Sequence, residues 1–255
     1  MFELDTIYNC DCLEGMKQIP SGSVDCVICD LPYGTTACAW DSVIPFEPLW
    51  EQYKRVTKPN AAIILFGSQP FTTKLIMSNI EWFKYEIIWE KTRGGNSIQL
   101  GTRPFKVHEN ICVFYDKQPT FNEEMWKIAD YYVDKRKSLN DHIVKSEHFK
   151  DKERLVKRYK DNGMRHMQSV LSFESEWNKD MHPTQKPVDL IRYLIRTYSN
   201  ESDIILDNTI GSGTTAVACI KENRHFIGFE LSKEYYDKAC RRIKLEQQQL
   251  SLFTN

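Results

Sequence analysis

The sequence alternates short runs rich in β-forming residues with stretches of helical spacing, and this alternation constrains the fold more than any other feature. Strands joined by helices of this length favour an α/β fold with a mostly parallel sheet and helices on both faces. The expected strands are 4–8, 24–29, 61–66, 85–89, 110–115, 203–206 and 225–229, and the expected helices are 45–56, 71–79, 188–199, 214–222 and 233–249.

The charge balance rules out a uniformly basic chain. The 34 Lys and Arg residues face 35 Asp and Glu residues, so any nucleic-acid surface has to be a local patch. The sequence lacks a run of about 18 uncharged apolar residues, so no membrane span is predicted. Its acidic segment 1–12 lacks the basic start of a signal peptide. We therefore expect a cytoplasmic protein.

Cys26 and Cys29 have the spacing of a metal or redox pair, but their segment has the pattern of a buried strand. Residues three apart on a strand face opposite sides of the sheet, so they cannot share one tetrahedral ion. The sequence holds no second pair of this kind and no paired histidines to complete a zinc set. We interpret these cysteines as reduced core residues and predict no metal site.

The segment 116–180 interrupts the alternation. It is rich in charged residues with interleaved aromatic ones, and basic residues outnumber acidic residues between positions 145 and 165. Cations combined with stacking rings suit phosphates and bases. This favours a small, mainly helical insertion that contacts nucleic acid, and a solvated helical hairpin is the alternative. The remaining segments, 1–115 and 181–255, would form one α/β domain.

The expected strand 203–206 leads into Asp207 and a loop that contains Gly211 and Gly213. Two glycines between a strand and a helix let the backbone turn tightly and approach a ligand closely. The loop is not a phosphate-binding P-loop, because no Lys follows its last glycine. The next strand ends at Glu230, and an acid about 20 positions after a glycine loop is placed to hold two ribose hydroxyls. The pattern predicts a ribose-binding site and does not require a dinucleotide.

A second candidate site follows the strand 24–29, which opens into Asp30, Leu31, Pro32 and Tyr33. Ligands of open α/β sheets bind at that edge. These residues suit an exocyclic amine on an aromatic ring, whose delocalised lone pair makes it a poor nucleophile. Asp30 and the carbonyl group of Leu31 would accept its two hydrogens and favour a tetrahedral nitrogen, while Tyr33 would stack on the ring. A surface turn with a structural tyrosine is the alternative.

Three ordered motifs resemble those of the S-adenosylmethionine-dependent DNA amino-methyltransferases: DLPYG at 30–34, HPTQKP at 182–187 and DNTIGSGTT at 207–215. Their order resembles the β group of adenine-N6 and cytosine-N4 enzymes. The resemblance implies a Rossmann-like class I methyltransferase fold with a seven-stranded sheet. The cofactor would lie at the switch point between the strands that end at Asp207 and Asp30. Segments 1–115 and 181–255 would be the catalytic domain, and 116–180 the DNA target-recognition region.

The resemblance also implies that S-adenosylmethionine is the cofactor and S-adenosylhomocysteine the product. Glu230 would bind the ribose, Asp11 matches an acid near the cofactor's adenine, and 182–187 would approach the methionine end. The structural alternatives are an exposed cation for Lys186, a turn acid for Asp11, a helix-cap neighbour for Glu230 and a core residue for Phe66. The loop 66–70 resembles a pocket-lining segment of the family. The implied cofactor-binding residues are Asp11, Cys12, His182, Thr184, Lys186, Asp207, Asn208, Gly211, Gly213, Thr214 and Glu230.

Two positions depart from the family pattern. Leu31 stands where proline is most frequent, and because a backbone carbonyl acts there, we expect activity to survive. Asn208 and Thr209 stand where a Pro-Phe pair is usual. This removes an aromatic surface beside the methyl donor, which bears on cofactor affinity and not on the reaction class.

A DNA duplex hides the target amine in base pairing, so the base has to be flipped into the pocket. Direct transfer to nitrogen needs no covalent intermediate. Methylation of cytosine carbon-5 does need a cysteine, usually after proline, and none of the ten prolines precedes a cysteine. The expected DNA-contacting residues, for which plain surface charges are the alternative, are Lys91, Arg93, Arg103, Lys106, Lys157 and Arg158.

Asp30 is the first residue of the tetrapeptide 30–33. The family has either Asp or Ser at this position, and Asp favours methylation of adenine N6 over cytosine N4. The alternatives are cytosine-N4 methylation of DNA, adenine-N6 methylation of RNA, and a non-catalytic nucleic-acid-binding protein on the same scaffold. Against the last, Asp30, Tyr33, Asp207 and Glu230 are all present. The expected partner is double-stranded DNA, without a membrane, and the small insertion favours a homodimer. We expect a restriction–modification role in a prokaryote or phage.

Overall fold

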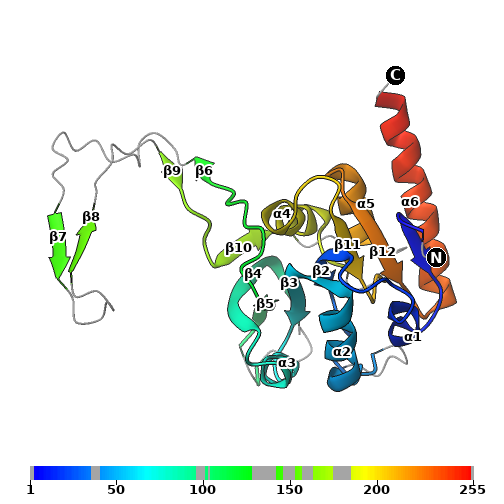
Figure 1. The fold of residues 1–255 in the computed structure, drawn as a ribbon, viewed down its shortest axis with the longest axis horizontal. Coiled ribbons are helices and arrows are strands. Elements are labelled where there is room, and N and C mark those ends of the chain that lie inside the picture. The colour runs from blue at the N-terminus through cyan, green and yellow to red at the C-terminus, as the bar shows by residue number, and fades with distance from the viewer. Residues whose placement is uncertain are drawn as a thin grey trace. The chain divides into compact units, whose positions relative to one another are not determined.

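The computed structural model describes residues 3–35, 41–95, 101–102, 104–127, 142–145, 153–156, 163–174 and 185–253. The chain divides into two units, one made of Met1–Asn122 and Ser169–Asn255 and the other of Glu123–Gln168. The first unit holds the central sheet and its helices, which Figure 1 labels.

Strands and helices of the first unit follow the predicted alternation, with differences at their ends. The strands are β1 (Thr6–Tyr8), β2 (Val24–Cys29), β3 (Thr57–Gly67), β4 (Phe83–Gly95), β5 (Lys106–Phe114), β10 (Val170–Phe173), β11 (Ile204–Asp207) and β12 (His225–Phe229). The helices are α1 (Cys12–Met16), α2 (Phe46–Val56), α3 (Phe71–Ser78), α4 (Val188–Tyr198), α5 (Thr214–Lys221) and α6 (Lys233–Phe253). Sequence reasoning missed the short elements α1 and β10.

These strands form one sheet in the order β1-β12-β11-β2-β3-β5-β4-β10. The first five are mutually parallel, and β5 runs antiparallel to β3 and β4. The predicted class I architecture with a mostly parallel sheet is confirmed, but the sheet has eight strands where seven were expected. The eighth, β10, pairs with β4 and places Val170 opposite Ile88. It covers an edge that would otherwise present unpaired backbone groups.

The strand order reverses between β11 and β2. The chain passes from β11 to β12 on one side, and from β2 to β3 on the other. Leu206 of β11 pairs with Val27 of β2 in parallel register, so both strands end at the same edge of the sheet. Connections that leave in opposite directions open a crevice at such an edge. The predicted adjacency of the strands that precede Asp207 and Asp30 is confirmed.

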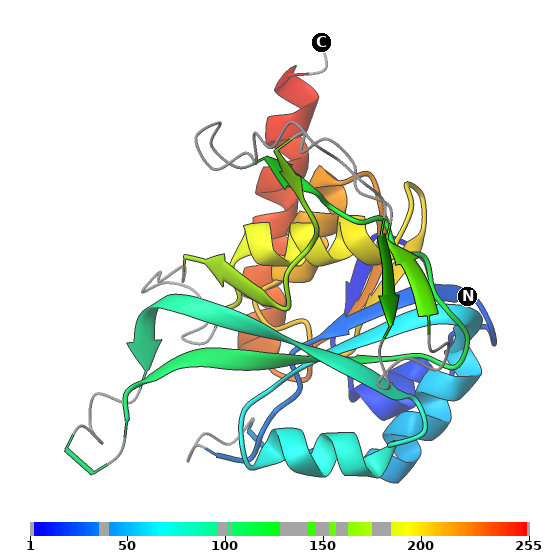
Figure 2. The same cartoon turned by 90° about the vertical axis from the view of Figure 1, so that its left-hand side faces the viewer.

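Helices cover both faces of the sheet, as Figures 1 and 2 show. Helices α1, α2 and α3 contact one another in turn on one face, and α4, α5 and α6 do so on the other. Helix α4 packs through an apolar stripe, since it buries Leu190, Ile191, Leu194 and Ile195, which share one helix face. Figure 2 also shows β4 and β5 as long twisted ribbons side by side. Within the described ranges, no helix combines the length and apolar character that membrane crossing requires.

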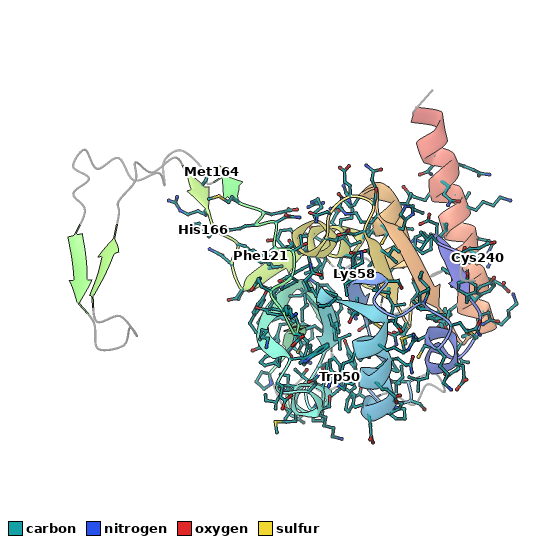
Figure 3. All side chains as sticks on the ribbon, in the orientation of Figure 1. Trp50, Lys58, Phe121, Met164, His166 and Cys240 are labelled. Carbon is teal, nitrogen blue, oxygen red and sulfur yellow. The ribbon has the colours of Figure 1, made fainter. Side chains whose placement is uncertain are left out.

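The core between the sheet and α2 contains aromatic rings packed at steep angles to one another. Trp50, labelled in Figure 3, lies 5.0 Å from the ring of Phe114 between centroids. Its indole N–H donates to the Ser78 hydroxyl over 2.8 Å, so this buried polar atom is satisfied. Cys26 and Cys29 are free thiols buried in β2, and burial raises the pKa of both. The expected position of this pair in the core is confirmed.

The second unit, which lies inside the predicted insertion 116–180, pairs strands in its described part. The pairs are β6 (Trp126–Lys127) with β9 (Met164–Arg165) and β7 (His142–Lys145) with β8 (Glu153–Val156), both antiparallel. The expectation of a mainly helical insertion was wrong for these residues. The charged composition obscured the β-branched neighbours Ile143 and Val144, which favour a strand and pair across β8.

Gly15 of α1 fixes how closely this helix approaches β12. A Cβ at this position would lie 2.3 Å from Cε1 of Phe229, whose ring is fully buried. We expect Gly15→Ala to lower the free energy of unfolding by about 1–3 kcal/mol through overpacking, despite the better helix propensity of alanine. Exposed Lys17, at the end of the same helix, provides the control: Lys17→Ala should change stability by less than about 0.5 kcal/mol. Denaturant unfolding followed by circular dichroism measures the stability of both variants. A Gly15→Ala variant as stable as the native protein would contradict the close contact.

Candidate active site at the ends of strands β2 and β11

A cavity of about 1120 Å³ lies at the carboxyl edge of the sheet. Its walls include the residues that follow β1, β2, β3, β11 and β12, together with part of β5. Segments that are far apart in the sequence, 30–33 and 207–212, therefore face one space. Pockets for one drug-sized ligand measure about 300–1,000 Å³. The volume of this cavity lies just above that range.

All four residues predicted to be catalytic line this cavity. Asp30 follows β2, and 28% of its side chain is exposed. The Tyr33 hydroxyl donates to Asp30 Oδ1 over 2.7 Å, and the Tyr33 ring stacks on Phe71 with centroids 5.0 Å apart. Burial and the nearby Asp30 raise the pKa of Tyr33 well above its usual value, so the hydroxyl stays a donor. Leu31 is buried, and Pro32 beside it is half-buried.

A second acid holds the backbone that follows the tetrapeptide. Asp41 is buried, and its two carboxylate oxygens accept hydrogen bonds of 2.8 Å from the backbone N–H groups of Gly34 and Thr35. Gly34 has a φ of +67°, a left-handed conformation that favours glycine. Sequence reasoning missed Asp41, because an acid shortly after a turn is too common a pattern to single out.

Lys186, which was expected to bind the cofactor, lies beside the catalytic segment. Its ammonium group binds Asp30 Oδ2 and lies 3.2 Å from Glu109 Oε2. Its Nζ is also 5.9 Å from the ring centre of Tyr33 and 5.1 Å from that of Phe66. Burial alone would lower the pKa of Lys186, but Asp30 and Glu109 outweigh it and raise that pKa. The alternative of an exposed cation is wrong, because only 7% of the side chain is exposed.

Glu109 of β5 continues this arrangement and was missed by sequence reasoning. Its Oε1 binds Lys91 of the neighbouring strand β4. Burial raises the pKa of Glu109, but Lys186 and Lys91 outweigh burial and lower it, so the group stays ionised. Lys91, Glu109, Lys186 and Asp30 thus alternate in sign, and we name these four residues the charge chain. The only sequence signal for Glu109 was a polar residue in an apolar strand.

Asp207 ends β11 and is buried in the cavity wall. Its Oδ1 accepts a hydrogen bond from the backbone N–H of Thr209 over 3.1 Å, and its Oδ2 accepts one from the Thr215 hydroxyl over 2.6 Å. Burial raises the pKa of Asp207 to about 7, although both hydrogen bonds favour the ionised form. Near neutral pH this carboxyl group therefore changes its charge.

Two glycines shape the loop that follows. Gly211 and Gly213 have φ values of +55° and +82°, both in the left-handed region. Gly213 directly precedes α5, and a Cβ there would lie 3.2 Å from the Cβ of Ala239 in α6. A Cβ at Gly211 would meet only the carbonyl oxygen of Thr209, at 4.0 Å, so the backbone borders open cavity space. Thr214, which begins α5, is buried and also lines the cavity.

Glu230 follows β12 and faces this loop. Its Oε2 accepts a hydrogen bond of 3.0 Å from the N–H of Gly211, and its Oε1 accepts one of 2.7 Å from the N–H of Ser232. Burial raises the pKa of Glu230 above its ordinary value. Each carboxylate oxygen has two lone pairs, so both can accept a further donor from a ligand.

Asp11 lies in the cavity wall after β1 and has a structural role as well. Its Oδ1 accepts hydrogen bonds from the N–H groups of Leu13 (2.9 Å) and Glu14 (3.1 Å), so it caps α1. Asp11 therefore has the local structural role that was the alternative, and it also lines the cavity. Cys12 lies next to it, buried and also in the wall.

Asn208 is buried and joins three elements. Its side-chain oxygen accepts a hydrogen bond from the Tyr53 hydroxyl of α2, and its amide donates to the Cys12 sulfur over 3.6 Å. At this position, where the family usually has proline, the chain has a hydrogen-bonded tie between α1, α2 and the cofactor loop.

Thr209 links the two halves of the site directly. Its hydroxyl donates to the backbone carbonyl of Asp30 over 2.9 Å and lies 2.9 Å from the sulfur of Cys29. A thiol can donate to this oxygen while the hydroxyl donates onward, so both groups are satisfied. A phenylalanine at this position would leave the Asp30 carbonyl without this donor.

The DNA-contacting candidates are described only in part. Lys106 lines the cavity, and its ammonium group binds the Ser68 hydroxyl. Lys91 belongs to the charge chain. For Arg93 the structure describes only the backbone, in β4. The other candidates lie outside the described residues, as do two of the predicted cofactor residues: Arg103, Lys157, Arg158, His182 and Thr184.

The residues around the glycine loop fit the cofactor that the motifs imply. Glu230 and Asp11 offer carboxylates that accept hydrogen bonds from ribose hydroxyls and an adenine amine, and Asp207 offers a carboxyl group to a cation. The open space beside Gly211 lets a ligand approach the backbone. The room around Asp30 and Tyr33 suits a planar ring that carries an amine.

The chain matches the DNA methylase family of N6 and N4 methyltransferases over residues 24–241. It is 28% identical to the type II methyltransferase M1.MboII of Moraxella bovis, over 94% of this chain and 96% of that protein. It is also 28% identical to the type II methyltransferase M.HpaI of Haemophilus parainfluenzae, over 92% of this chain and 72% of that protein.

Two solved structures resemble the fold. The complex of M1.HpyAVI with SAM superposes with a TM-score of 0.61 at 25% identity, covering 93% of this chain and 98% of that one. The cytosine-N4-specific PvuII DNA methyltransferase superposes with a TM-score of 0.65 at 15% identity, covering 93% of this chain and 85% of that one. At this lower identity the likeness shows the fold alone.

We expect Thr209→Val to lower the free energy of unfolding by about 1–2 kcal/mol, because the Asp30 carbonyl loses its buried donor while the side-chain volume is kept. Thr209→Ser keeps the hydroxyl and serves as the matched control, with a smaller loss. Denaturant unfolding of the cofactor-free protein measures both. A valine variant as stable as the serine variant would show that the hydroxyl does not hold the two segments together.

The raised pKa of Asp207 predicts a dependence of stability on pH. The folded protein holds this proton up to about pH 7, while the unfolded chain loses it near 3.8. The stabilisation by that proton is therefore complete below the unfolded pKa and is lost as the pH rises through 7. Asp207→Asn cannot ionise. We expect its stability relative to the native protein to rise by about 2–4 kcal/mol between pH 4.5 and pH 8. Denaturant unfolding across this range checks it, and a constant difference would refute it.

Proposed function

The chain belongs to the DNA methylase family whose members methylate adenine N6 or cytosine N4, and from this premise we propose that its target is the N6 amine of adenine. The methyl donor is S-adenosylmethionine, and S-adenosylhomocysteine is the product. The relatives M1.MboII and M.HpaI are type II methyltransferases, and this supports a role in restriction–modification.

The observation that carries the proposed methyl transfer is the direct contact between the two halves of the cavity. The Thr209 hydroxyl of the cofactor loop donates to the backbone carbonyl of Asp30, and both residues line one space. A donor and an acceptor that react directly have to be held next to each other, and a shared cavity supplies this proximity. The arrangement supports direct transfer without a covalent intermediate on the protein.

At the donor end, Glu230 would accept the ribose hydroxyls and Asp11 would lie near the adenine of the cofactor. Asp207 would face positive charge on the methionine part. When bound, S-adenosylmethionine supplies a methyl group on a sulfonium. The backbone of Gly211 and Gly213 would let it approach closely.

At the acceptor end, Asp30 and the carbonyl of Leu31 would accept the two amine hydrogens. This favours a tetrahedral nitrogen, whose lone pair is then available for attack. Tyr33 would stack on the base, supported from behind by Phe71. The nitrogen gains positive charge as it is methylated. The negatively charged carboxylate of Asp30 would stabilise this positive charge and accept the proton that the nitrogen releases.

The target is proposed to be a base flipped out of double-stranded DNA, because pairing hides the amine inside the duplex. Lys106 lines the cavity and can approach a phosphate. The insertion would contribute target recognition, and a homodimer would enlarge the DNA-binding surface. Asp at the first position of the tetrapeptide supports adenine as the target.

The chemical identity of the product tests the target. Genomic DNA from cells that express the protein is digested to nucleosides and analysed by mass spectrometry, with an Asp30→Ala strain as the control. We expect N6-methyldeoxyadenosine in the first sample alone. N4-methyldeoxycytidine in its place would overturn the choice of adenine, and mapping of the modified positions supplies the recognition sequence.

We expect Asp30→Ala to lower methyl transfer by at least about 100-fold, because it removes a preorganised acceptor for the developing charge. Its affinity for S-adenosylmethionine should stay within about threefold, since the cofactor loop is unchanged. Radiolabelled methyl transfer and calorimetric titration measure the two quantities. Glu201→Ala, at an exposed position outside both the cavity and the insertion, is the control. Unchanged turnover in Asp30→Ala would remove this residue from the mechanism, and a lack of transfer by the native protein would favour the non-catalytic alternative.

A further inference from the structure

We propose that Lys186 is a positioning residue that occupies the place of the target base until the base enters, and that Glu109 then receives its ammonium group. The inference rests on the proposed function, because it concerns the same acceptor site. It assigns a role on the target side to Lys186 and Glu109.

Both carboxylate oxygens of Asp30 already accept one hydrogen bond each before any base arrives. Oδ1 accepts the Tyr33 hydroxyl, and Oδ2 accepts the ammonium group of Lys186. A target amine that donates to Asp30 has to share or displace one of these donors. The neutral hydroxyl is compatible with a nearby amine. The ammonium group is not, because its positive charge opposes the positive charge that develops on the nitrogen during methylation.

The ammonium group also lies in the slot that a ring would occupy. Its Nζ is over the face of Tyr33 at 5.9 Å and over the face of Phe66 at 5.1 Å. A base that stacks on Tyr33 would compete for this space. Cation–π contacts of this kind stabilise an ammonium group in a partly desolvated position, so the slot stays filled without a ligand.

Glu109 provides the second position for the ammonium group. Its Oε2 is buried, and no hydrogen bond of good geometry reaches it within the part of the chain that the structure describes, although Lys186 Nζ lies 3.2 Å away. A buried carboxylate oxygen without a well-aligned donor is costly, so it gains from a closer approach of Lys186. A short side-chain movement therefore frees Asp30 and keeps both buried charges paired.

Lys91 holds the other oxygen of Glu109 and completes the charge chain. It keeps Glu109 in place on β5 while Lys186 moves. The charge chain stays balanced in both positions of Lys186, since two cations and two carboxylates are present throughout. The movement changes only the partner of the Lys186 ammonium group, which is Asp30 before the base enters and Glu109 afterwards.

The test uses Glu109→Gln, which keeps the shape of the side chain but no longer attracts the ammonium group as a carboxylate does. Lys186 should then stay on Asp30. We expect the single-turnover methylation rate to fall about 10- to 100-fold. Fluorescence of 2-aminopurine at the target position of the mapped duplex should show reduced base insertion. Affinities for cofactor and duplex should stay near native values. Glu86→Gln, the same change on the neighbouring strand β4, is the matched control and should keep native rates.

The double variant Glu109→Gln/Lys186→Met decides between positioning and a structural role. Because it removes the cation that would block Asp30, we expect base insertion and the rate to recover at least about tenfold over Glu109→Gln. A double variant that inserts the base as poorly as Glu109→Gln would overturn the inference, as would native behaviour of Glu109→Gln. A native protein without methyl transfer would instead refute the proposed function, so the two failures are distinguishable.

Discussion

The parallel pairing of β2 with β11 is the constraint on which the site depends. Because the chain leaves these two strands in opposite directions, their carboxyl ends border an open crevice. The crevice receives Asp30 from one strand and Asp207 from the other, and Thr209 ties them together by a hydrogen bond. A change that separated β2 from β11 would leave each segment locally intact but would remove the shared cavity. The packing of helices on both faces fixes this pair in the middle of the sheet, where neither strand can move independently.

Sequence reasoning located the strand ends and both glycine-marked segments, because they are local patterns: a β-rich run, a turn and a helix start within a few residues. It missed Glu109 and Asp41, whose importance arises only from three-dimensional contacts. Glu109 lies in β5, which runs antiparallel to β3, and its partners Lys91 and Lys186 come from β4 and from the segment before α4. Local periodicity carries no information about such pairings.

The same limitation explains the error about the insertion and the contacts of Lys186, Asn208 and Thr209 that sequence reasoning did not foresee. The motif around Lys186 predicts a cofactor contact, and sequence alone gave no sign that the fold also brings its ammonium group to Asp30. The pair Asn208 and Thr209 looked like the loss of an aromatic surface, and it provides hydrogen bonds to neighbouring elements in its place. In the insertion, charge composition suggested a mainly helical segment that contacts nucleic acid, although a short β-branched segment is enough to pair strands. Composition describes solvent exposure better than it describes backbone conformation.

The pKa values of the buried carboxyl groups are shifted in opposite directions at the two ends of the cavity. At the acceptor end, the lysines of the charge chain lower the pKa of Glu109 in spite of its burial. At the donor end, burial raises the pKa of Asp207 and of Glu230. Uncompensated acids of this kind bind a proton or a cation with a similar benefit, since either one removes the cost of an isolated buried charge. A cationic ligand at the donor end therefore favours the ionised form of Asp207, and its binding is linked to the release of a proton near neutral pH. The acceptor end, by contrast, is neutralised by its own side chains and has no need of a cationic ligand, which suits an uncharged base.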